Sequence, residues 1–217
     1  GGCAEYTGAP FYAALAALKT GADLAHVFCQ HEAAVPIKAY SPELIVHGYL
    51  HASPDVDPDA VQRQASAVSR WFPALSALVV GPGLGRDETL RAVATEVLER
   101  ALDGGLPCVI DADGLRLVQD RPKLVRGHPW ALLTPNAVEF GRLSAALELP
   151  VPGGAGISAG ERQEEVVRLA AALEGPAVLR KGEHDIISDG RSVFSVDEPG
   201  SLKRSGGQGD VLAGSLA

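Results

Sequence analysis

The chain has 217 residues, of which 46% are hydrophobic, so it can bury a full core, and one domain is the natural expectation. Its formal net charge of −8 argues against a nucleic-acid backbone or an anionic membrane surface as a partner. No apolar run approaches the length of a membrane span, and no signal peptide is recognisable.

The ends of the chain and its cysteines add two expectations. The chain starts with two glycines rather than Met and stops within a helical pattern, so we expect a domain truncated at both ends. Cys3, Cys29 and Cys108 lie in or near apolar runs without Cys-x-x-Cys spacing. This pattern predicts buried, reduced thiols and a reducing compartment.

Helix and strand patterns alternate through the first half of the chain. Apolar periodicity predicts, in order, a helix over about 10–18, a strand over 23–29, a helix over 58–71, a strand over 77–80 and a helix over 90–101. Thr7 is a candidate cap of the first helix and Gly21 its end, while Gly104 ends the helix over 90–101.

The alternation continues to the end of the chain. The patterns predict strands over 107–110 and 131–133, a helix from about 136, a helix over 159–173, and strands over 177–179, 184–188 and 192–196. Residues 150–156 resemble a loop between two helices, and Asp189-Gly190 predicts a tight hairpin. Repeated strand–helix alternation predicts an α/β fold with a mainly parallel sheet, helices on both faces and an antiparallel edge.

The predicted strands end in segments rich in Gly, Asp, Asn and Lys. These segments are GPGLGRD, DADGL, TPNAVEF and the residues around Lys181-Gly182-Glu183. Ligands of open parallel sheets bind outside the carboxyl ends of the strands, so we expect a shared cleft there. Asn136 and Glu139 also fit a capping box, which would explain that pair without a ligand.

The segment Ser205-Gly206-Gly207-Gln208-Gly209-Asp210 precedes an apolar, small-residue helical pattern. Glycines let backbone N–H groups converge, and a helix N-terminus adds unpaired donors, so the segment predicts a phosphate site. A carboxylate beside a phosphate is best explained as a base that takes a proton from a neighbouring hydroxyl. The alternative is a glycine-rich loop in which Asp210 is an ordinary first-turn helix residue.

Other familiar sites are disfavoured. Arg86 stands where the last glycine of G-x-G-x-x-G belongs, and the chain contains neither a Walker A loop nor a G-x-S-x-G elbow. His47 and His51 are four residues apart in an extended, proline-bounded region without a suitable acidic third ligand, which disfavours a metal site. His26, within an apolar strand, is expected to be a satisfied core histidine.

In combination, these segments resemble the ribokinase-like superfamily. More narrowly, GGQGD preceded by VGPGLGRD, IDADGL, LTPNAVEF and KGEHDIISDG resembles the ATP- or ADP-dependent (S)-NAD(P)H-hydrate dehydratases. The opening GG…YTGAP and the segment YSPELIV resemble the same family, so the resemblance covers essentially the whole chain. It implies one ribokinase-like domain, a three-layer α/β/α sandwich with a hairpin at one sheet edge.

The resemblance implies a lyase that repairs hydrated NADH and NADPH. ATP or ADP, with Mg²⁺, would phosphorylate the ring hydroxyl of the S epimer, and phosphate would then be eliminated. The hydrated cofactor is the expected small-molecule partner, with no nucleic acid or membrane partner and with a homo-oligomer as the family's pattern. The cytoplasm and the mitochondrion are the expected locations.

The family's pattern also implies site residues. Asp210 would be the catalytic base, with the backbone groups of Gly207 and Gly209 stabilising the transferring phosphoryl group. The nucleotide would contact two segments, consisting of Lys181, Gly182, Glu183, His184 and Asp185, and of Gly200, Ser201, Leu202, Lys203, Arg204, Ser205, Gly206, Gly207, Gln208 and Gly209. The hydrated dinucleotide would contact Gly83, Gly85, Asn136, Ala137, Val138, Glu139, Phe140, Gly141, Arg142 and Asp210. Glu139 is a candidate metal or water-network ligand.

Some features depart from the family, and alternatives stay open. Ser205 stands where animal members usually carry Cys, and the family's strand before Gly1 and its helices after Ala217 are absent from this sequence. A superfamily kinase acting on a vitamin precursor or a sugar would use the same Asp210 and anion site. A non-catalytic nucleotide-binding module is the reading favoured if the chain naturally ends here.

Overall fold

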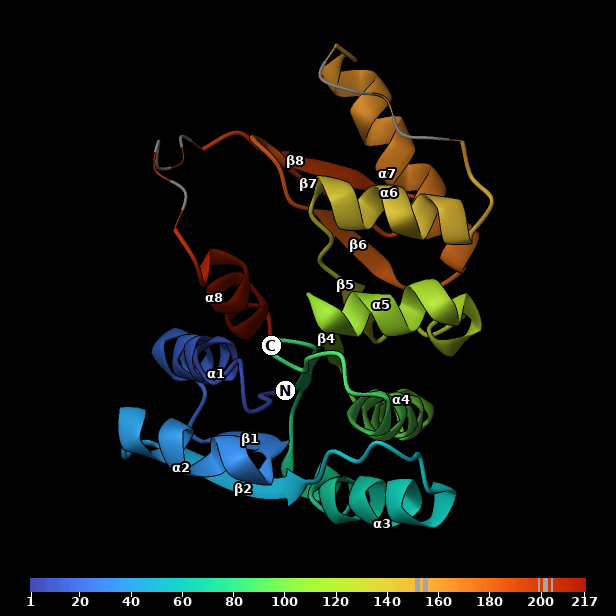
Figure 1. Ribbon diagram of the computed structural model, residues 1–217. Coiled ribbons are helices and arrows are strands. Elements are labelled where there is room, and N and C mark those ends of the chain that lie inside the picture. The colour runs from blue at the N-terminus through green and yellow to red at the C-terminus, as the bar shows by residue number, and fades with distance from the viewer. Residues whose placement is uncertain (151–152, 154–155, 199, 201–202, 204) are drawn as a thin grey trace. The chain divides into compact units, whose positions relative to one another are not determined.

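The structure is a computed structural model that describes residues 1–150, 153, 156–198, 200, 203 and 205–217. It divides into two compact units (Figure 1). Unit 1 consists of Gly1–Gly114 together with Ser205–Ala217, and unit 2 of Leu115–Arg204. Each unit has its own strands and helices, and the single domain expected from the sequence stays a prediction.

Unit 1 contains two pairs of parallel strands with helices packed on them. Its elements are α1 (Gly8–Thr20), β1 (Ala25–Gln30), α2 (His31–Tyr40), β2 (Leu44–Leu50), α3 (Pro58–Ser69), β3 (Leu78–Val80), α4 (Glu88–Asp103), β4 (Cys108–Ile110) and α8 (Gln208–Ser215). Strand β1 pairs with β2 from Ala25–Leu44 onward, and β3 pairs with β4 from Leu78–Cys108 onward. Helix α3 packs against α4, and α1 packs against α8.

Helices α1 and α8 approach each other closely because Gly214 has no side chain. A Cβ at Gly214 would lie 1.9 Å from the carbonyl oxygen of Ala13 in α1. Gly21 ends α1 as expected, with φ +125° and its N–H directed at the carbonyls of Ala17 and Leu18. Thr7 stands at the N-cap but forms no side-chain capping bond, and its hydroxyl instead bonds to the Tyr40 hydroxyl at 2.8 Å. The close approach at Gly214 holds α8, near the end of the chain, against α1.

The buried side chains of β1 and β2 form a core with those of α2. Val27, Cys29, Ile37 and Val46 all belong to it. The strand over 23–29 is confirmed with a shift, since β1 runs from Ala25 to Gln30, whereas α2 was not expected from the sequence. It contains Pro36 in its interior, a residue that is unfavourable inside a helix, and tertiary packing on β2 outweighs that cost.

Unit 2 combines a parallel strand pair with an antiparallel edge. Its elements are α5 (Asp113–Asp120, whose first two residues belong to unit 1), β5 (Ala131–Leu133), α6 (Ala137–Ala146), α7 (Ala159–Leu173), β6 (Ala177–Arg180), β7 (Asp185–Ser188) and β8 (Val193–Val196). Strand β5 is parallel to β6, whereas β6, β7 and β8 pair antiparallel. The Asp189-Gly190 hairpin is confirmed: Gly190 has φ +85°, and Asp189 Oδ1 accepts the backbone N–H groups of Arg191 and Ser192.

The predicted fold class, α/β with mainly parallel strands and an edge hairpin, is therefore confirmed. Most helix and strand boundaries agree with the sequence patterns to within two or three residues, and the helix over 159–173 and the strand over 131–133 agree at both ends. In the described part of the chain, no helix has the length and apolarity to cross a bilayer.

Candidate active site

The glycine-rich segment leads into helix α8, as the sequence indicated. Gly207 is the N-cap in a left-handed conformation (φ +86°, ψ −9°), and the helix begins at Gln208. Asp210 lies in the first turn, and the Val211 N–H donates to the Gly207 carbonyl at 2.9 Å. In general, the N–H groups of a helix's first turn have no partner within the helix itself, and such a helix N-terminus is suited to hold an anion.

The aromatic ring of Tyr12 in α1 packs directly on Gly207. A Cβ at position 207 would lie 3.0 Å from Tyr12 Cδ2 and 3.2 Å from its Cε2. Tyr12 remains 45% exposed, so it forms part of the surface beside the N-terminus of α8. The positive φ and this close approach both require glycine at position 207.

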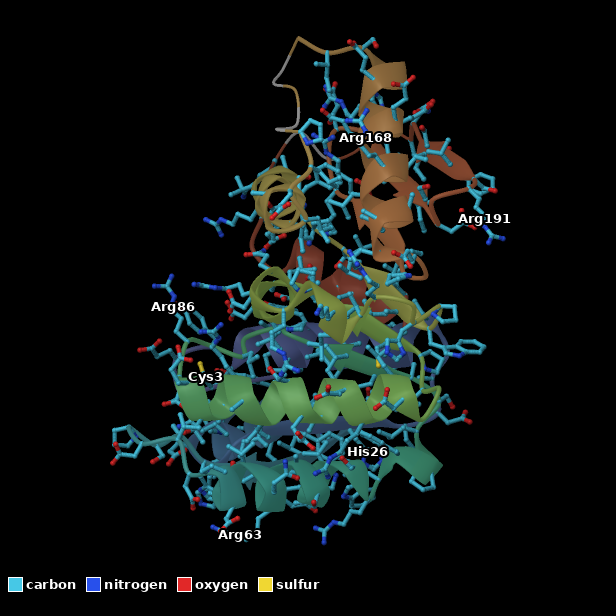
Figure 2. All side chains as sticks on the ribbon, turned by 90° about the vertical axis from the view of Figure 1, so that its right-hand side faces the viewer. Cys3, His26, Arg63, Arg86, Arg168 and Arg191 are labelled. Atoms are coloured by element: carbon cyan, nitrogen blue, oxygen red, sulfur yellow. The ribbon has the colours of Figure 1, made fainter. Side chains whose placement is uncertain are left out.

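The predicted loop Gly81–Gly85 contacts the N-terminal segment of the chain. The Gly83 carbonyl accepts the N–H groups of Gly2 and Cys3, and a Cβ on Gly83 would lie 2.6 Å from the Tyr6 carbonyl oxygen. A Cβ on Gly85 would lie 2.8 Å from Cys3 Sγ, and Figure 2 labels Cys3. The GPGLG and YTGAP segments are thus neighbours in unit 1.

The loop Gly81–Gly85 is also bonded to the first residues of α5. The Gly85 N–H donates to Asp113 Oδ2 at 2.9 Å. Gly81 and Gly114 approach so closely that a Cβ on Gly81 would lie 2.5 Å from the Gly114 nitrogen. The Asp113 carboxylate therefore holds the loop that carries the candidate substrate residues Gly83 and Gly85.

In unit 2, Asn136 and Glu139 form the capping box that the sequence suggested. Asn136 Oδ1 accepts the N–H groups of Val138 and Glu139, and Glu139 Oε2 accepts the Asn136 N–H at 2.8 Å. Val138 is 62% exposed, whereas Phe140 is only 1% exposed. The capping role is established, and a ligand role for Asn136–Arg142 stays a prediction.

The segment Lys181–Asp185 forms a turn between β6 and β7. The Lys181 N–H donates to the Pro135 carbonyl at 2.8 Å, and the Gly182 N–H donates to Asp185 Oδ1 at 2.9 Å. His184 Nδ1 lies 3.5 Å from Asp197 Oδ1. Asp185 thus shapes its own turn, and the segment lies next to the residue that precedes α6.

The candidate residues fall into two groups. Gly83, Gly85 and the residues Ser205–Asp210 belong to unit 1, while Asn136–Arg142, Lys181–Asp185, Gly200 and Lys203 belong to unit 2. Ser201, Leu202 and Arg204 lie outside the described residues. The sequence patterns missed Tyr12 and Asp113 as partners of the glycine segments, because nothing in a sequence indicates which distant side chain a glycine contacts.

The three cysteines are buried as expected, whereas His26, which was expected in the core, is only partly buried. Cys3, Cys29 and Cys108 are buried free thiols, and burial raises the pKa of the Cys108 thiol to about 12. His26 Nδ1 lies 3.0 Å from His47 Nε2, which joins β1 to β2. In the ranges that the structure describes, no three His, Cys, Asp or Glu side chains are grouped to hold a metal ion.

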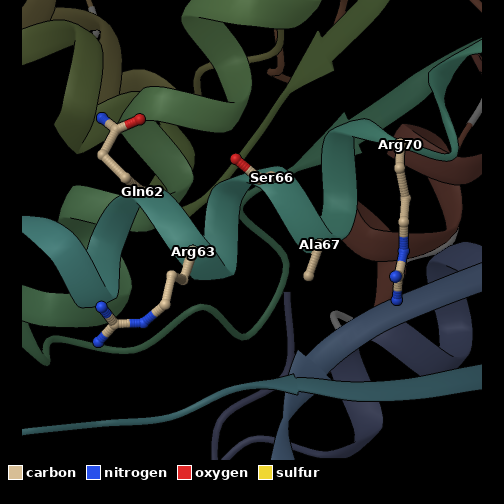
Figure 3. A pocket seen from close by; sticks show the side chains of 5 residues that line it. All are labelled: Gln62, Arg63, Ser66, Ala67 and Arg70. Atoms are coloured by element: carbon tan, nitrogen blue, oxygen red, sulfur yellow. The ribbon is translucent and has the colours of Figure 1, made fainter.

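A pocket along α3, in unit 1, is lined by residues that belong to none of these segments. It is lined by Gln62, Arg63, Ser66, Ala67 and Arg70, and Figure 3 shows the two arginines pointing to the same side. Arg63 is paired with Asp57 at 3.5 Å, and the Arg70 guanidinium lies over the Tyr49 ring. Both cations therefore have partners within unit 1, and none of the lining residues is a candidate from the sequence.

A protein-family model described as NAD(P)H-hydrate dehydratase matches residues 1–217. The chain belongs to the NAD(P)H-hydrate dehydratase family. Its relatives include the ATP-dependent (S)-NAD(P)H-hydrate dehydratases of Bos taurus, 54% identical over 217 residues, and of Homo sapiens, 50% identical. The whole chain is matched in both cases, but it spans only 61% and 58% of the lengths of these relatives.

Solved structures extend the similarity of this family member to the ribokinase-like fold. A ribokinase-like superfamily protein from Enterococcus faecalis aligns with a TM-score of 0.73 at 23% identity, covering 100% of this chain and 68% of the other. The ADP/ATP-dependent NAD(P)H-hydrate dehydratase from Bacillus subtilis, co-crystallized with ATP/Mg²⁺, aligns with a TM-score of 0.63 at 19% identity, covering 98% and 67%. At such identities the similarity establishes the fold.

Proposed function

We propose that this protein is a hydro-lyase that uses ATP or ADP to dehydrate the S epimer of hydrated NADH and NADPH. The observation that carries the proposal is Asp210 in the first turn of α8, behind the left-handed Gly207. The names of the relatives at 54% and 50% identity support the choice of reaction. This reaction would restore the ordinary reduced cofactor, so the protein would act in metabolite repair.

The first step is phosphorylation of the ring hydroxyl, because hydroxide is a poor leaving group. The hydroxyl oxygen attacks the terminal phosphorus of the nucleotide, its proton passes to the Asp210 carboxylate, and the shortened nucleotide leaves. The backbone N–H groups of Gly207 and Gly209 and the positive end of α8 stabilise the charge on the transferring phosphoryl group.

The second step is elimination of phosphate. The bond between the ring carbon and the phosphate oxygen breaks, its electron pair leaves with phosphate, and the lone pair of the ring nitrogen supplies the push. Loss of a proton from the neighbouring ring carbon restores the double bond. The products are the reduced cofactor, phosphate, the shortened nucleotide and a proton, and the oxygen of the ring hydroxyl ends in the phosphate.

The ligands are assigned to segments of each unit. In unit 1, Gly83 and Gly85 are proposed to contact the hydrated dinucleotide, and Ser205–Gly209 the nucleotide phosphates. In unit 2, Asn136–Arg142 are proposed to contact the dinucleotide, and Lys181–Asp185 with 200–204 the nucleotide. Lys181 is the cation that we assign to a phosphate contact.

Magnesium fits this set of residues because Mg²⁺ keeps several waters and binds through one or two carboxylates together with substrate phosphates. It therefore needs no dedicated cluster of protein ligands, and Glu139 is the carboxylate proposed to contact it or its water network. When bound, it would neutralise charge on the phosphates. The proposed locations are the cytoplasm and the mitochondrion, and a homo-oligomer is proposed from the family's pattern.

The test follows absorbance at the reduced-nicotinamide band with the protein, ATP, Mg²⁺ and hydrated NADH. We expect recovery of the band with the wild-type protein and a loss of roughly 10²- to 10⁴-fold in rate with Asp210→Asn, as for removal of a general base. Asp59→Asn, which changes an exposed carboxylate of α3, is the matched control and should retain the wild-type rate.

Two outcomes would contradict the proposal. No recovery by the wild-type protein, with ATP still bound, would leave a kinase or a non-catalytic nucleotide-binding module. Full activity of Asp210→Asn would show that another group takes the proton.

A further inference from the structure

Arg180, the last residue of β6, is a buried cation in unit 2. Its side chain is 8% exposed, and its Nη1 donates to Glu165 Oε2 of α7 at 2.7 Å. The Glu165 side chain is itself only 14% exposed, and its other oxygen, Oε1, accepts the Gly153 N–H at 2.5 Å. The pair therefore fixes the end of β6 to one turn of α7.

The same guanidinium also contacts α6. Its central carbon lies 4.6 Å from the centroid of the Phe140 ring, a cation–π distance. Phe140 is fully buried and lies one residue after Glu139, within the segment Asn136–Arg142. Arg180 thus connects three elements, β6, α6 and α7, through one side chain.

A backbone hydrogen bond also connects the end of β6 with the start of α6. Lys181, which follows Arg180, donates its N–H to the Pro135 carbonyl at 2.8 Å. Pro135 precedes the Asn136 cap of α6. The strand end that leads into Lys181–Asp185 and the start of α6 are therefore held together twice, once by a side chain and once by a backbone hydrogen bond.

We propose that Arg180 is a positioning residue that sets the spacing between the start of α6 and the turn Lys181–Asp185. The inference rests on the proposed function, which assigns these two segments to the dinucleotide and to the nucleotide. A buried ion pair adds little net stability compared with apolar packing. The fixed geometry that the Arg180–Glu165 pair imposes on the elements it joins therefore explains the pair better than a gain in stability does. A planar guanidinium can pair with a carboxylate through its N–H groups while it lies over an aromatic ring.

The test compares Arg180→Lys with Arg100→Lys. Arg100 is a matched control because its Nε pairs with Glu96 at 2.8 Å on α4, in unit 1 and outside every candidate segment. Arg180→Lys keeps the charge but removes the guanidinium that lies over the Phe140 ring. We expect Arg180→Lys to lower kcat/KM roughly ten- to hundredfold, chiefly through a higher KM for the hydrated cofactor. The assay is run well below the melting temperature of the variant, so that unfolding does not contribute. Arg100→Lys should leave both constants unchanged.

A second measurement does not depend on activity. Hydrogen exchange of the Lys181 amide, which reports its bond to Pro135, should speed up at least tenfold in Arg180→Lys and in Phe140→Leu. Exchange at the same rate as in the wild-type protein, or unchanged kinetic constants in an active enzyme, would overturn the inference. If the wild-type protein showed no dehydratase activity, the proposed function would fail, and exchange at Lys181 would still decide whether Arg180 holds these segments together.

Discussion

At the scale of single residues, the glycine segment before α8 contains two positions with different constraints. Gly207 has φ +86° and lies against the Tyr12 ring, whereas a Cβ on Gly206 would meet nothing within 4 Å. The GGQGD pattern thus combines one glycine that the backbone and the packing require with one that they leave open. An accessible Gly206 is consistent with the close approach of a phosphate.

Gly207→Ala should destabilise the protein by about 1–2 kcal/mol, because an L-residue in the left-handed region costs that much and the new methyl group meets the Tyr12 ring. Gly206→Ala should be close to neutral in stability. Urea unfolding of the two variants checks this difference. Equal losses in both variants would show that the Tyr12 contact does not constrain the loop.

At the scale of elements, helix ends carry much of the local information in this chain. Asn136 and Ser158 each begin a helix with a complete capping box, which satisfies backbone N–H groups that have no partner within the helix. The cap at Asn136 was predicted from the sequence, and the helix over 159–173 was predicted from its apolar periodicity. By contrast, α2 has a helix-breaking Pro36 and no side-chain cap, so its sequence gives little local signal.

Asn136→Ala should cost about 1 kcal/mol of stability, within the range of 0.5–2 for loss of an N-cap. Asn136→Asp keeps an acceptor for the Val138 and Glu139 N–H groups and should preserve stability. Thermal unfolding of both variants measures the capping role. If Asn136 also contacts the dinucleotide, Asn136→Asp will raise KM while its melting temperature stays unchanged, which separates the two roles.

At the scale of the whole molecule, stability should depend on pH through the histidine pair between β1 and β2. Desolvation lowers the pKa of His47 below the usual 6.5, and the nearby charges of His26, Lys38 and Arg70 lower it further. The folded protein therefore favours neutral His47, while the unfolded chain takes up a proton more readily. This contribution to stability is complete above pH 6.5 and is lost as the pH falls through the lowered pKa of the folded state.

We expect the urea concentration at the unfolding midpoint to decrease when the pH is lowered from 7.5 to 5.5. The decrease should be smaller in His47→Gln, which removes the titrating ring. His128→Gln, a change in unit 2, is the comparison variant. The same decrease with pH in wild-type protein and His47→Gln would assign the pH dependence to other groups.

The amino-acid sequence by itself determined the α/β class, most helix and strand boundaries, the hairpin at Asp189-Gly190 and the family. These features depend on local periodicity, capping and glycine, and the motifs are contiguous. The tertiary structure decided that Tyr12 lies against Gly207, that Asp113 holds Gly85, and that Arg180 joins Phe140 to Glu165. Such partners are far apart in the chain and are chosen by packing between elements, which no local pattern encodes.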